Sequence, residues 1–541
     1  MGLYRRLGYP GYGIYHDFKN RLPYYKSDFV DAYNYRVIPS TIFVFFTNLL
    51  PAIAFAQDMF DATDNSYGLN EVLMSSAIGG CAFGLFAGQP LTITGVTGPI
   101  AIFSNTVYKL LKSRDTPYFP FMCWIYLWSM VFHFIIAIFN WVSWLKIISS
   151  FSCDAFGFFI NFVYITKGIE ILTRQFDLGR DSGYSSIMVA LLMVIFGCGC
   201  YYFGNYCHLL TPWIRKGFTD YGLPICVIFF TGFIHFGGQL DSTHFATLPT
   251  GKSFQPTELV TRDGWFIHFW NISVGDVFLA IPFAILLTIL FYFDHNVSAL
   301  MCQTRDYPLK KPASFHWDFA LLGLTTGISG LFGLPPPNGL IPQAPLHTHS
   351  LAVHDKYGNV ISMVEQRVTN TTQGLITFVM MTKPFLVVLG LIPQAILSGL
   401  FFAMGFIGLH ESIVTNRIRY ILTEPEYRRA DFPEIFKMVE KLQNFKWFII
   451  YTFLEAIVGL AEYAITVTPG AIGFPVVLLG SMICAKWIWP LFIPKTELAI
   501  LDASIVEPGI MESLVLSKKS GKHIVEVEEV IENDLESNKD S

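Results

Sequence analysis

Charged residues are scarce in this chain. Asp, Glu, Lys and Arg together make up only 14% of its 541 residues, whereas hydrophobic residues make up 52%. Water-soluble domains usually carry about a quarter charged residues. One large soluble core does not explain the deficit, because runs without any charged residue recur along most of the chain. The scarcity of charge therefore argues against an ordinary soluble domain and favours a membrane protein.

Several sequence signals of chemistry and of nucleic-acid binding are also missing. The chain has no basic block, no zinc-ligand spacing, no nucleophile elbow and no phosphate-binding loop, so we expect no nucleic-acid partner, no metal, no cofactor and no enzyme activity. The nine cysteines are odd in number, lie mostly in apolar runs and do not resemble a disulfide framework. His347, His349 and His354 are irregularly spaced, and we do not expect them to bind a metal. Residues 1–35 are polar and tyrosine-rich and do not resemble a cleavable signal sequence.

Apolar runs long enough to cross a bilayer are present instead. A helix needs roughly 20 apolar residues to cross a hydrocarbon core about 30 Å thick. The sequence predicts fourteen segments, at about 37–57, 71–89, 92–109, 119–141, 155–176, 186–206, 220–238, 274–294, 317–333, 339–354, 372–390, 393–410, 446–463 and 470–493. An even number places both termini on one side, and the Lys and Arg residues of 1–36 and 411–446 identify that side as the cytosol. The loop that holds Lys109, Lys112 and Arg114 goes against this assignment.

The domain organisation follows from these segments. We predict an all-α polytopic membrane protein with a cytosolic arm (1–36), a first group of seven segments (37–238), an outer loop (239–273) and a second group of seven (274–493). The inner loop 411–446 contains an amphipathic stretch, Ser412–Leu422, which we expect to lie along the membrane surface. A cytosolic tail (494–541) is expected to be disordered from about residue 515, because it is charged and poor in aromatic residues.

Two charge-free runs are too long for one helix and are broken in the middle. Val72–Tyr108 is interrupted at Gly88-Gln89-Pro90, Gly95 and Gly98-Pro99, and Phe319–His354 is interrupted at Gly333–Gly339, Pro342 and Pro345. Proline and glycine at this density end helices, and the freed backbone cannot face lipid. Gly95 lies about 60 residues after the first segment begins, and Gly339 lies about 65 residues after the eighth begins. Interruptions in equivalent places predict two seven-segment halves with a transport site at the broken helices.

The broken segments also indicate a class of substrate. A half-helix that begins within the membrane has unpaired N–H groups and a partial positive charge at its start. Two such starts, at about Thr97 and about Gly339, would face each other and bind an oxyanion without a fixed cation. Packing glycines and simple helix kinks are the alternative. Gly80, Gly84 and Gly88 repeat every four residues and predict a close helix–helix contact.

Asp294, Glu455 and Glu462 are acidic residues within apolar segments. An acid inside a membrane segment is costly and therefore a functional candidate. Asp294 follows a charge-free run in the eighth segment, where either a site residue or a helix end among the headgroups would explain it. Glu455 and Glu462 have no helix break nearby, and we expect a packing or interfacial role for them.

The residues around both breaks resemble a known family. Gln89-Pro90-Leu91-Thr92, followed by Gly95 and Thr97-Gly98-Pro99, is similar to the third-segment motif of solute carrier family 4, the bicarbonate transporters and anion exchangers. Gly333-Leu334-Pro335, Gly339–Leu351, Glu365–Thr369 and Phe402–Gly405 resemble its second half in the same order. The resemblance covers about residues 37–493, and Leu334–Gln343 is most similar to the borate exporters of fungi and plants.

The resemblance implies a fold, an assembly and a site. The fold has fourteen segments in two inverted repeats, with half-helices at segments 3 and 10, a core domain (segments 1–4 and 8–11) and a gate domain (segments 5–7 and 12–14). It implies a homodimer held through the gate domains in the lipid of the plasma membrane, and alternating access by motion of core against gate. The substrate-binding residues implied by the resemblance are Gly95, Val96, Thr97, Gly98, Pro99, Asp294, Asn338, Gly339, Gln343 and Ala344.

One departure from the anion exchangers bears on the substrate. They have an arginine early in segment ten, where this chain has Gln343. The loss of a fixed cation favours borate or boric acid over bicarbonate or chloride, because glutamine can both donate and accept hydrogen bonds. We therefore expect a secondary transporter that exports borate. A bicarbonate or chloride exchanger, a nucleobase or sulfate carrier of the same architecture, and an anion channel are the alternatives.

Overall fold

The computed structural model describes residues 9–114, 116–236, 244–257, 264–304, 307–354, 360–468 and 470–502, with the side chains of 146, 147 and 354 left out. The expected disorder beyond residue 515 lies outside these ranges, as do parts of the predicted outer loop, at 239–243 and 258–263. The described chain is mostly helical, with two small two-stranded sheets.

Helices lie in each of the seven segments predicted for the first half. After the arm helices α2 (Tyr12–Arg21) and α3 (Ser27–Val30) they are α4 (Val37–Ala62), α5 (Leu69–Phe86), α6 (Gly98–Leu111), α7 (Tyr118–Ile138), α8 (Ser150–Gln175), α9 (Arg180–Tyr206) and α10 (Pro212–Phe233). Strand β1 (Thr94–Gly95) lies between α5 and α6.

The second half contains both long and short helices. Its helices are α11 (Val274–Met301), α12 (His316–Leu331), α13 (Gln343–Ser350), α14 (Val368–Val379), α15 (Lys383–Leu389), α16 (Gln394–Glu411), α17 (Ile413–Leu422), α18 (Pro425–Asp431), α19 (Pro433–Glu440), α20 (Phe445–Thr466), α21 (Phe474–Ile483), α22 (Trp489–Phe492) and α23 (Lys495–Leu501). Strand β2 (Asn338–Gly339) precedes α13, and β3 (Ala352–His354) pairs with β4 (Val360–Met363) after it.

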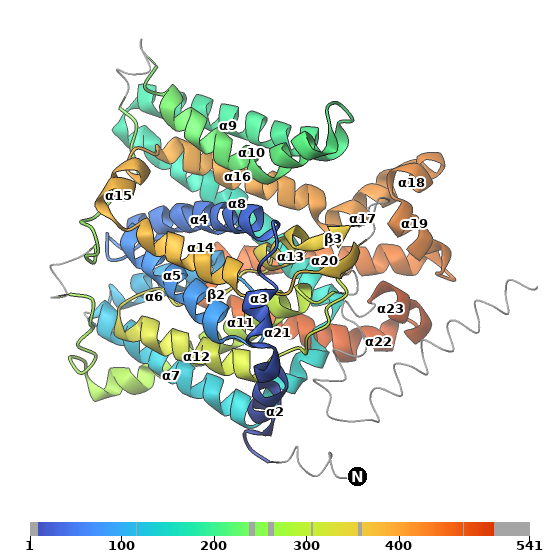
Figure 1. Ribbon diagram of the computed structural model, residues 1–541, viewed down its shortest axis with the longest axis horizontal. Helices are drawn as coiled ribbons and strands as arrows, with labels where there is room; N and C mark the ends of the chain where they lie inside the picture. The colour runs from blue at the N-terminus through green and yellow to red at the C-terminus, as the bar shows by residue number, and fades with distance from the viewer. Residues whose placement is uncertain are drawn as a thin grey trace, which may run out of the picture.

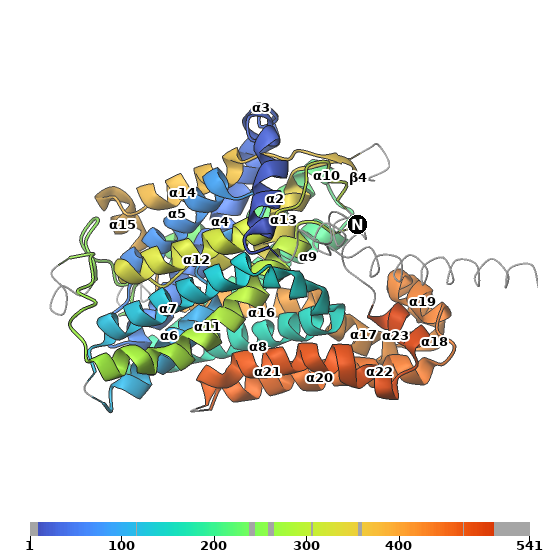
Figure 2. The ribbon, with the colours of Figure 1, turned by 90° about the horizontal axis from the view of Figure 1, so that it is seen from below.

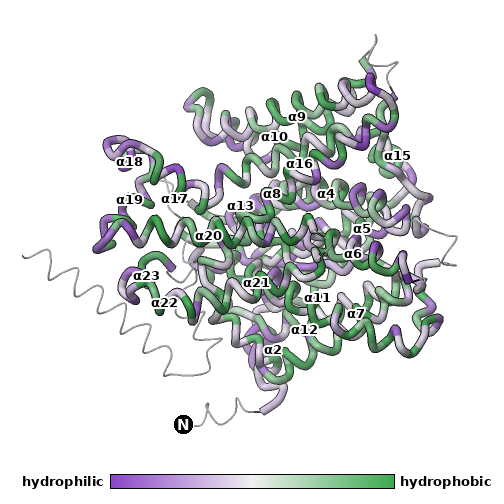
Figure 3. The backbone as a smooth tube through the Cα atoms, turned by 180° about the vertical axis from the view of Figure 1, so that it is seen from behind, coloured by the Kyte–Doolittle hydropathy of each residue, from purple (hydrophilic) through white to green (hydrophobic). Residues whose placement is uncertain are grey.

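Many of these helices are suited to a bilayer. Among the described residues, nine helices are long and apolar enough to cross a membrane, or ten if α14 and α15, which are bent by 87° at their break, form one span. The chain is therefore a multi-pass membrane protein. Figure 3 shows hydrophobic residues along the long helices and hydrophilic residues gathered in α18 and α19, which belong to the predicted inner loop.

The helices form a bundle around α4, α5, α6, α11 and α14. In Figure 1, α9, α10 and α16 lie along the top of the molecule and α7 and α12 along the bottom, and Figure 2 shows α20, α21 and α22 along the face opposite α3 and α14. Helix α5 packs tightly on α14, because a Cβ at Gly84 would lie 2.6 Å from the backbone nitrogen of Thr371. The close helix contact predicted for Gly80 and Gly84 is thus confirmed, whereas Gly88 lies against Ser314 instead.

The two helices that follow the breaks, α6 and α13, are each too short to cross a membrane. Helix α6 has 14 residues and begins at Gly98, directly after Thr97, which confirms the predicted start. Helix α13 has 8 residues and begins at Gln343, so the predicted start at Gly339 is wrong. The reason is that Asn338 and Gly339 are extended and pair with β1, and that the helix starts only after Pro342.

Candidate functional site

The backbone that follows α5 belongs to no helix or strand until β1. Two of its amides are satisfied by a carboxylate, because Asp318 of α12 accepts from Gly88 N–H at 2.6 Å and from Gln89 N–H at 2.9 Å. The carbonyls that end α5 are satisfied by Arg367, whose Nη1 donates to Gly84 at 3.3 Å, Leu85 at 3.2 Å and Ala87 at 2.8 Å.

Two further side chains complete this set. Asn370 Nδ2 donates to the carbonyls of Pro90 at 3.2 Å and Thr92 at 2.9 Å, and His347 Nδ1 lies 2.8 Å from the carbonyl oxygen of Leu91. Asp318, His347, Arg367 and Asn370 are buried and all belong to the second half of the chain. Side chains of one half thus supply the hydrogen bonds that the broken backbone of the other half needs away from water.

The two breaks also pair with each other. Strands β1 and β2 are antiparallel, with Thr94 opposite Gly339 and Gly95 opposite Asn338, and Leu340 N–H donates to the Ile93 carbonyl at 2.9 Å. Glycine is required at position 339, because a Cβ there would lie 2.8 Å from the His295 Cα of α11. Both short helices therefore begin from one small sheet, which uses some of the N–H groups that the sequence assigned to the ligand.

Several buried polar atoms around this sheet have no hydrogen-bond partner in the part of the chain that the structure describes, and three of them belong to residues predicted for the site. These three are Thr97 Oγ1, Asp294 Oδ1 and Gln343 Oε1. The other carboxylate oxygen of Asp294, which is 2% exposed, accepts from Asn338 Nδ2 at 3.1 Å, and Gln343 Nε2 lies 3.4 Å from the carbonyl oxygen of Thr47. Buried polar atoms without partners are costly, so the arrangement suits a polar ligand or water at this place.

These atoms lie at a cavity of about 1240 Å³. Of the residues predicted for the site, Val96, Thr97, Gly98, Pro99, Asp294, Gly339 and Gln343 line it. Gly95 and Asn338 lie behind this wall and support it through the sheet and the bond to Asp294. Ala344 does not fit the prediction, because it is buried in an apolar cluster with residues such as Leu91 and Leu351.

Sequence reasoning missed Asn48 of α4. Asn48 lines the cavity, and its Nδ2 donates to Gln373 Oε1 at 3.0 Å, while Gln373 Nε2 donates to Asn370 Oδ1 at 3.1 Å. This chain of amides connects the cavity wall to the carbonyls that Asn370 holds. An amide inside the charge-free run Val37–Gln57 was the available signal.

One end of the cavity is closed by rings and ion pairs. The rings of Phe55 (α4), Tyr164 (α8) and Phe401 (α16) contact one another, with centroids 5.4 to 6.1 Å apart. Beyond them toward the C-terminal end of α4, Lys167 Nζ lies 3.1 Å from Asp58 Oδ1, and Arg174 pairs with Asp61. None of these four charged residues is part of the cavity wall.

The other end of the cavity reaches α10 and α17. Its wall there includes Arg215, Lys216, Glu411 and Arg417. Arg417 is buried and donates to both carboxylate oxygens of Glu455, at 2.6 and 2.7 Å. Burial lowers the pKa of the Arg417 guanidinium, but the nearby carboxylates have the larger effect and raise that pKa overall. Glu455 is therefore an ion-pair partner that anchors the inner loop.

The comparisons with known proteins place the chain in a family. Residues 9–180 and 180–506 match the family described as HCO3- transporter integral membrane domain. Boron transporter 1 of Saccharomyces cerevisiae is 52% identical over 519 residues, which are 95% of this chain and 88% of that protein. Band 3 anion transport protein of Homo sapiens is 25% identical over 522 residues, 91% of this chain and 56% of that protein. The chain belongs to the bicarbonate transporter family, a class of integral membrane transporters.

A solved structure agrees in fold. The transmembrane domain of the cyanobacterium bicarbonate transporter BicA matches with a TM-score of 0.52 at 13% identity, over 80% of this chain and 98% of that chain. At this identity the match concerns the fold alone, and the fold is that of a membrane transporter. The family assignment confirms the resemblance that the two broken segments indicated.

Proposed function

We propose that this protein is a secondary active transporter that exports borate or boric acid across the plasma membrane by alternating access. The observation that carries the proposal is the meeting of Thr97, Asp294 and Gln343, each with an unpartnered polar atom among the described residues, at one cavity beside the start of α6. The 52% identity with Boron transporter 1 of Saccharomyces cerevisiae supports borate as the substrate.

The chemistry of the site fits a ligand that carries hydroxyl groups. Borate hydroxyls can donate to Asp294 Oδ1, Thr97 Oγ1 and Gln343 Oε1, and borate oxygens can accept from the N–H groups at the start of α6. The lysine and arginine residues that line the cavity, in its described part, come from α10 and α17, at the far end. A site without a fixed cation favours hydrogen bonding over charge pairing and so favours borate over bicarbonate or chloride.

We further propose that fourteen segments cross the membrane in two inverted repeats, 37–238 and 274–493. The occurrence of a helix in each predicted segment, and the pairing of β1 with β2 from equivalent places in the two halves, support this arrangement. On this proposal α4–α7 and α11–α15 form the core, α8–α10, α16 and α20–α22 form the gate, and a homodimer is held through the gates.

The cavity has the form expected of an inward-facing state. The arm and the basic inner loop assign the side of α10 and α17 to the cytosol, and the cavity extends to that side. The rings of Phe55, Tyr164 and Phe401, and the ion pairs beyond them, close the opposite side. Both termini are cytosolic on this assignment. Movement of the core against the gate would open these contacts and expose the site to the outside.

Boron efflux from proteoliposomes loaded with borate tests the proposal. We expect saturable efflux from the wild type and a loss of at least about tenfold in Asp294→Asn and in Gln343→Ala, because each removes a hydrogen-bond acceptor at the site. Glu462→Gln is the matched control, since Glu462 is an equally buried membrane acid that does not line the cavity.

Each alternative predicts a different result in the same vesicles. Normal efflux in both site variants at equal protein content would show that the site is elsewhere. Labelled bicarbonate or chloride flux without boron flux would identify an anion exchanger. Competition by uracil or sulfate would point to the nucleobase or sulfate carriers. A conductance that does not saturate would identify a channel.

A further inference from the structure

The N-terminal arm is docked onto the helices that carry the site. Helices α2 and α3 lie across α12 and beside α14 (Figures 1 and 2). Asp17 of α2 accepts from the first amides of α12, those of Phe315 at 3.0 Å, His316 at 2.7 Å and Trp317 at 3.2 Å. The arm therefore supplies an N-terminal cap to a helix of the proposed core.

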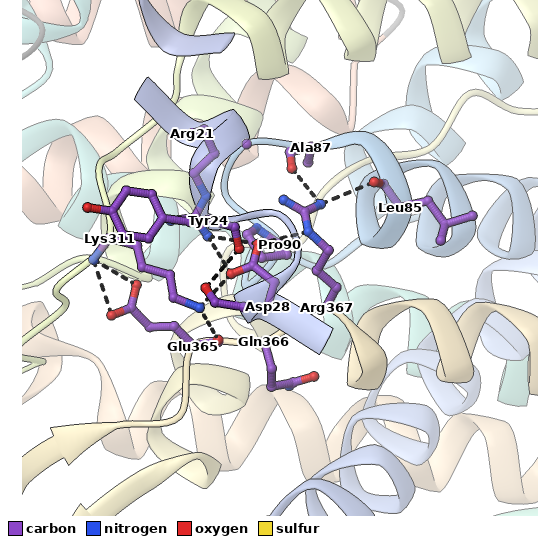
Figure 4. Close-up of polar contacts among 12 residues, drawn as sticks. Arg21, Tyr24, Asp28, Leu85, Ala87, Pro90, Lys311, Glu365, Gln366 and Arg367 are labelled. Atoms are coloured by element: carbon purple, nitrogen blue, oxygen red, sulfur yellow. Dashed lines mark hydrogen bonds and ion pairs between the residues drawn. The ribbon is translucent and has the colours of Figure 1, made fainter. Parts of the chain in front are cut away.

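A second acid of the arm lies deeper. Asp28 of α3 is 0% exposed and is surrounded by three cations, Arg21 of the same arm and Lys311 and Arg367 from distant parts of the chain (Figure 4). Its carboxylate lies 3.4 Å from Arg21 Nη2, 2.7 Å from Lys311 Nζ and 2.8 Å from Arg367 Nε. In addition, Arg367 N–H donates to the Asp28 carbonyl at 3.3 Å.

Arg367 connects Asp28 to the first break. Its Nε faces the Asp28 carboxylate, while its Nη1 donates to the three carbonyls that end α5 (Figure 4). The Tyr25 ring of the arm lies 4.7 Å from the guanidinium carbon. Directly after these carbonyls the chain passes through Gly88-Gln89-Pro90 into β1 and then to Thr97 at the site.

The planar guanidinium can make both sets of bonds only in one orientation. Asp28 is the one carboxylate within ion-pair distance of Arg367 in the described chain. Without its charge, Arg21 and Arg367 would have no ion-pair partner in the described chain, and Lys311 would keep only Asp31. Arg367 would also lose the bond that orients its guanidinium. The carbonyls at the end of α5 would then lose their donor.

We propose that Asp28 is a positioning residue for the substrate site, which it reaches through Arg367 and the end of α5. This proposal rests on the proposed function for the location of the site, but its structural part does not depend on the substrate. The N-terminal arm is then a component of the transport machinery and holds the start of α6 in place from the cytosolic side.

The test compares Asp28→Asn with two matched arm variants in the full-length protein. Asp17 caps α12 and does not pair with Arg367, so Asp17→Asn weakens the docking of the arm alone. Asp31 is an exposed residue that contacts Lys311 at 2.8 Å, so Asp31→Asn removes another partner of the same lysine. We expect Asp28→Asn to raise the KM for boron efflux at least about fivefold, the effect of one lost charge-assisted hydrogen bond. Asp17→Asn should lower the melting temperature with an unchanged KM, and Asp31→Asn should resemble the wild type.

Hydrogen exchange gives a second readout that needs no substrate. Asp28→Asn should speed exchange in residues 85–99, whereas Asp17→Asn should speed it in residues 313–320. If Asp28→Asn does not fold, Asp28→Glu takes its place, because it keeps the charge but lengthens the side chain. Asp28→Glu should raise the KM and the exchange rate of residues 85–99 by smaller amounts. A wild type without boron efflux would refute the proposed function, and the exchange pattern would still decide the positioning role.

The double variant with Arg367→Lys tests the order of contacts. If Asp28 acts through Arg367, the double variant should have the KM of Arg367→Lys alone, because the second change removes an interaction that is already lost. Additive changes in KM would overturn the proposal. So would a KM within twofold of the wild type, or an unchanged exchange rate at 85–99, in Asp28→Asn.

Discussion

Gly339→Ala is the sharpest test of the small sheet at the centre of the molecule. Gly339 pairs with Thr94 and lies against the backbone of α11. Its φ angle is not among the positive ones, so alanine meets no conformational penalty there and the substitution tests space alone. The added methyl group is the smallest perturbation that the chain allows at this place.

The structure gives the size of the effect. The new Cβ would lie 2.8 Å from His295 Cα and 3.2 Å from the Asp294 carbonyl oxygen, whereas ordinary contacts begin at 3.4 Å. Because backbone atoms cannot rotate away, β2 and α11 must separate by about 0.6 Å. That shift would stretch the 3.1 Å bond between Asn338 and Asp294 beyond hydrogen-bond length. Overpacking of this kind costs typically 1–3 kcal/mol.

Boron efflux and thermal unfolding measure both consequences. We expect a fall in efflux of at least about tenfold, since a lost hydrogen bond and a displaced carboxylate each cost about 1 kcal/mol or more, together with a lower melting temperature. Gly199→Ala is the control, because among the described residues nothing outside its own stretch of helix lies within 4 Å of its added Cβ, and alanine favours a helix. Wild-type efflux and stability in Gly339→Ala would refute the close packing of β2 on α11.

Three further predictions follow from other contacts. Asp318→Asn removes one of two acceptors for backbone amides and should destabilise the fold by about 1–3 kcal/mol in thermal unfolding. Asp58→Asn removes the pairing of Asp58 with Lys167 and should therefore favour the outward-open state. In a cysteine-free background that carries Thr97→Cys, an impermeant thiol reagent added outside should then label this cysteine faster. An unchanged labelling rate would refute the role of the pair. Burial raises the pKa of the Glu365 carboxyl above 4.5 in the folded protein. Its contribution to stability is therefore full below pH 4.5 and is lost as the pH rises through the pKa of the folded state. Compared with the wild type, Glu365→Gln should gain more melting temperature at about pH 8 than at about pH 5.

The sequence predicted those features that depend on local chemistry. The start of α6 at Gly98 follows from Pro99, which fits the first turn of a helix, and Asp294 could be placed because an acid in an apolar run is rare. The start of α13 could not be placed, because Gly339 is held extended by a strand from the other half of the chain. Local sequence does not reveal such a partner.

Contacts between distant residues account for the other omissions. Asp28 and Arg367 are 339 positions apart, and Asn48 and Gln373 are 325 apart, so no pattern along the chain connects them. Both pairs position side chains that satisfy the broken backbone: Asp28 contacts Arg367 directly, and Asn48 reaches Asn370 through Gln373. The sequence showed that the backbone was broken, but only the fold shows which side chains replace its missing hydrogen bonds.

The pairing of the two breaks constrains how access to the site can alternate. The polar atoms of Thr97, Asp294 and Gln343 come from α11, from the residue before α6 and from the start of α13, which one sheet and the side chains around the break join into a single body. The facing wall comes from α8, α9, α10 and α16 and contributes residues such as Tyr164. Opening the site by separating the two short helices would break the sheet and leave buried backbone groups unpaired, at a cost of about 1–3 kcal/mol for each group. Sliding of the whole body along the facing wall leaves the sheet intact and breaks side-chain contacts instead, such as the ring contact of Phe55 with Tyr164 and the ion pair of Asp58 with Lys167, so we expect a bound ligand to travel with this body.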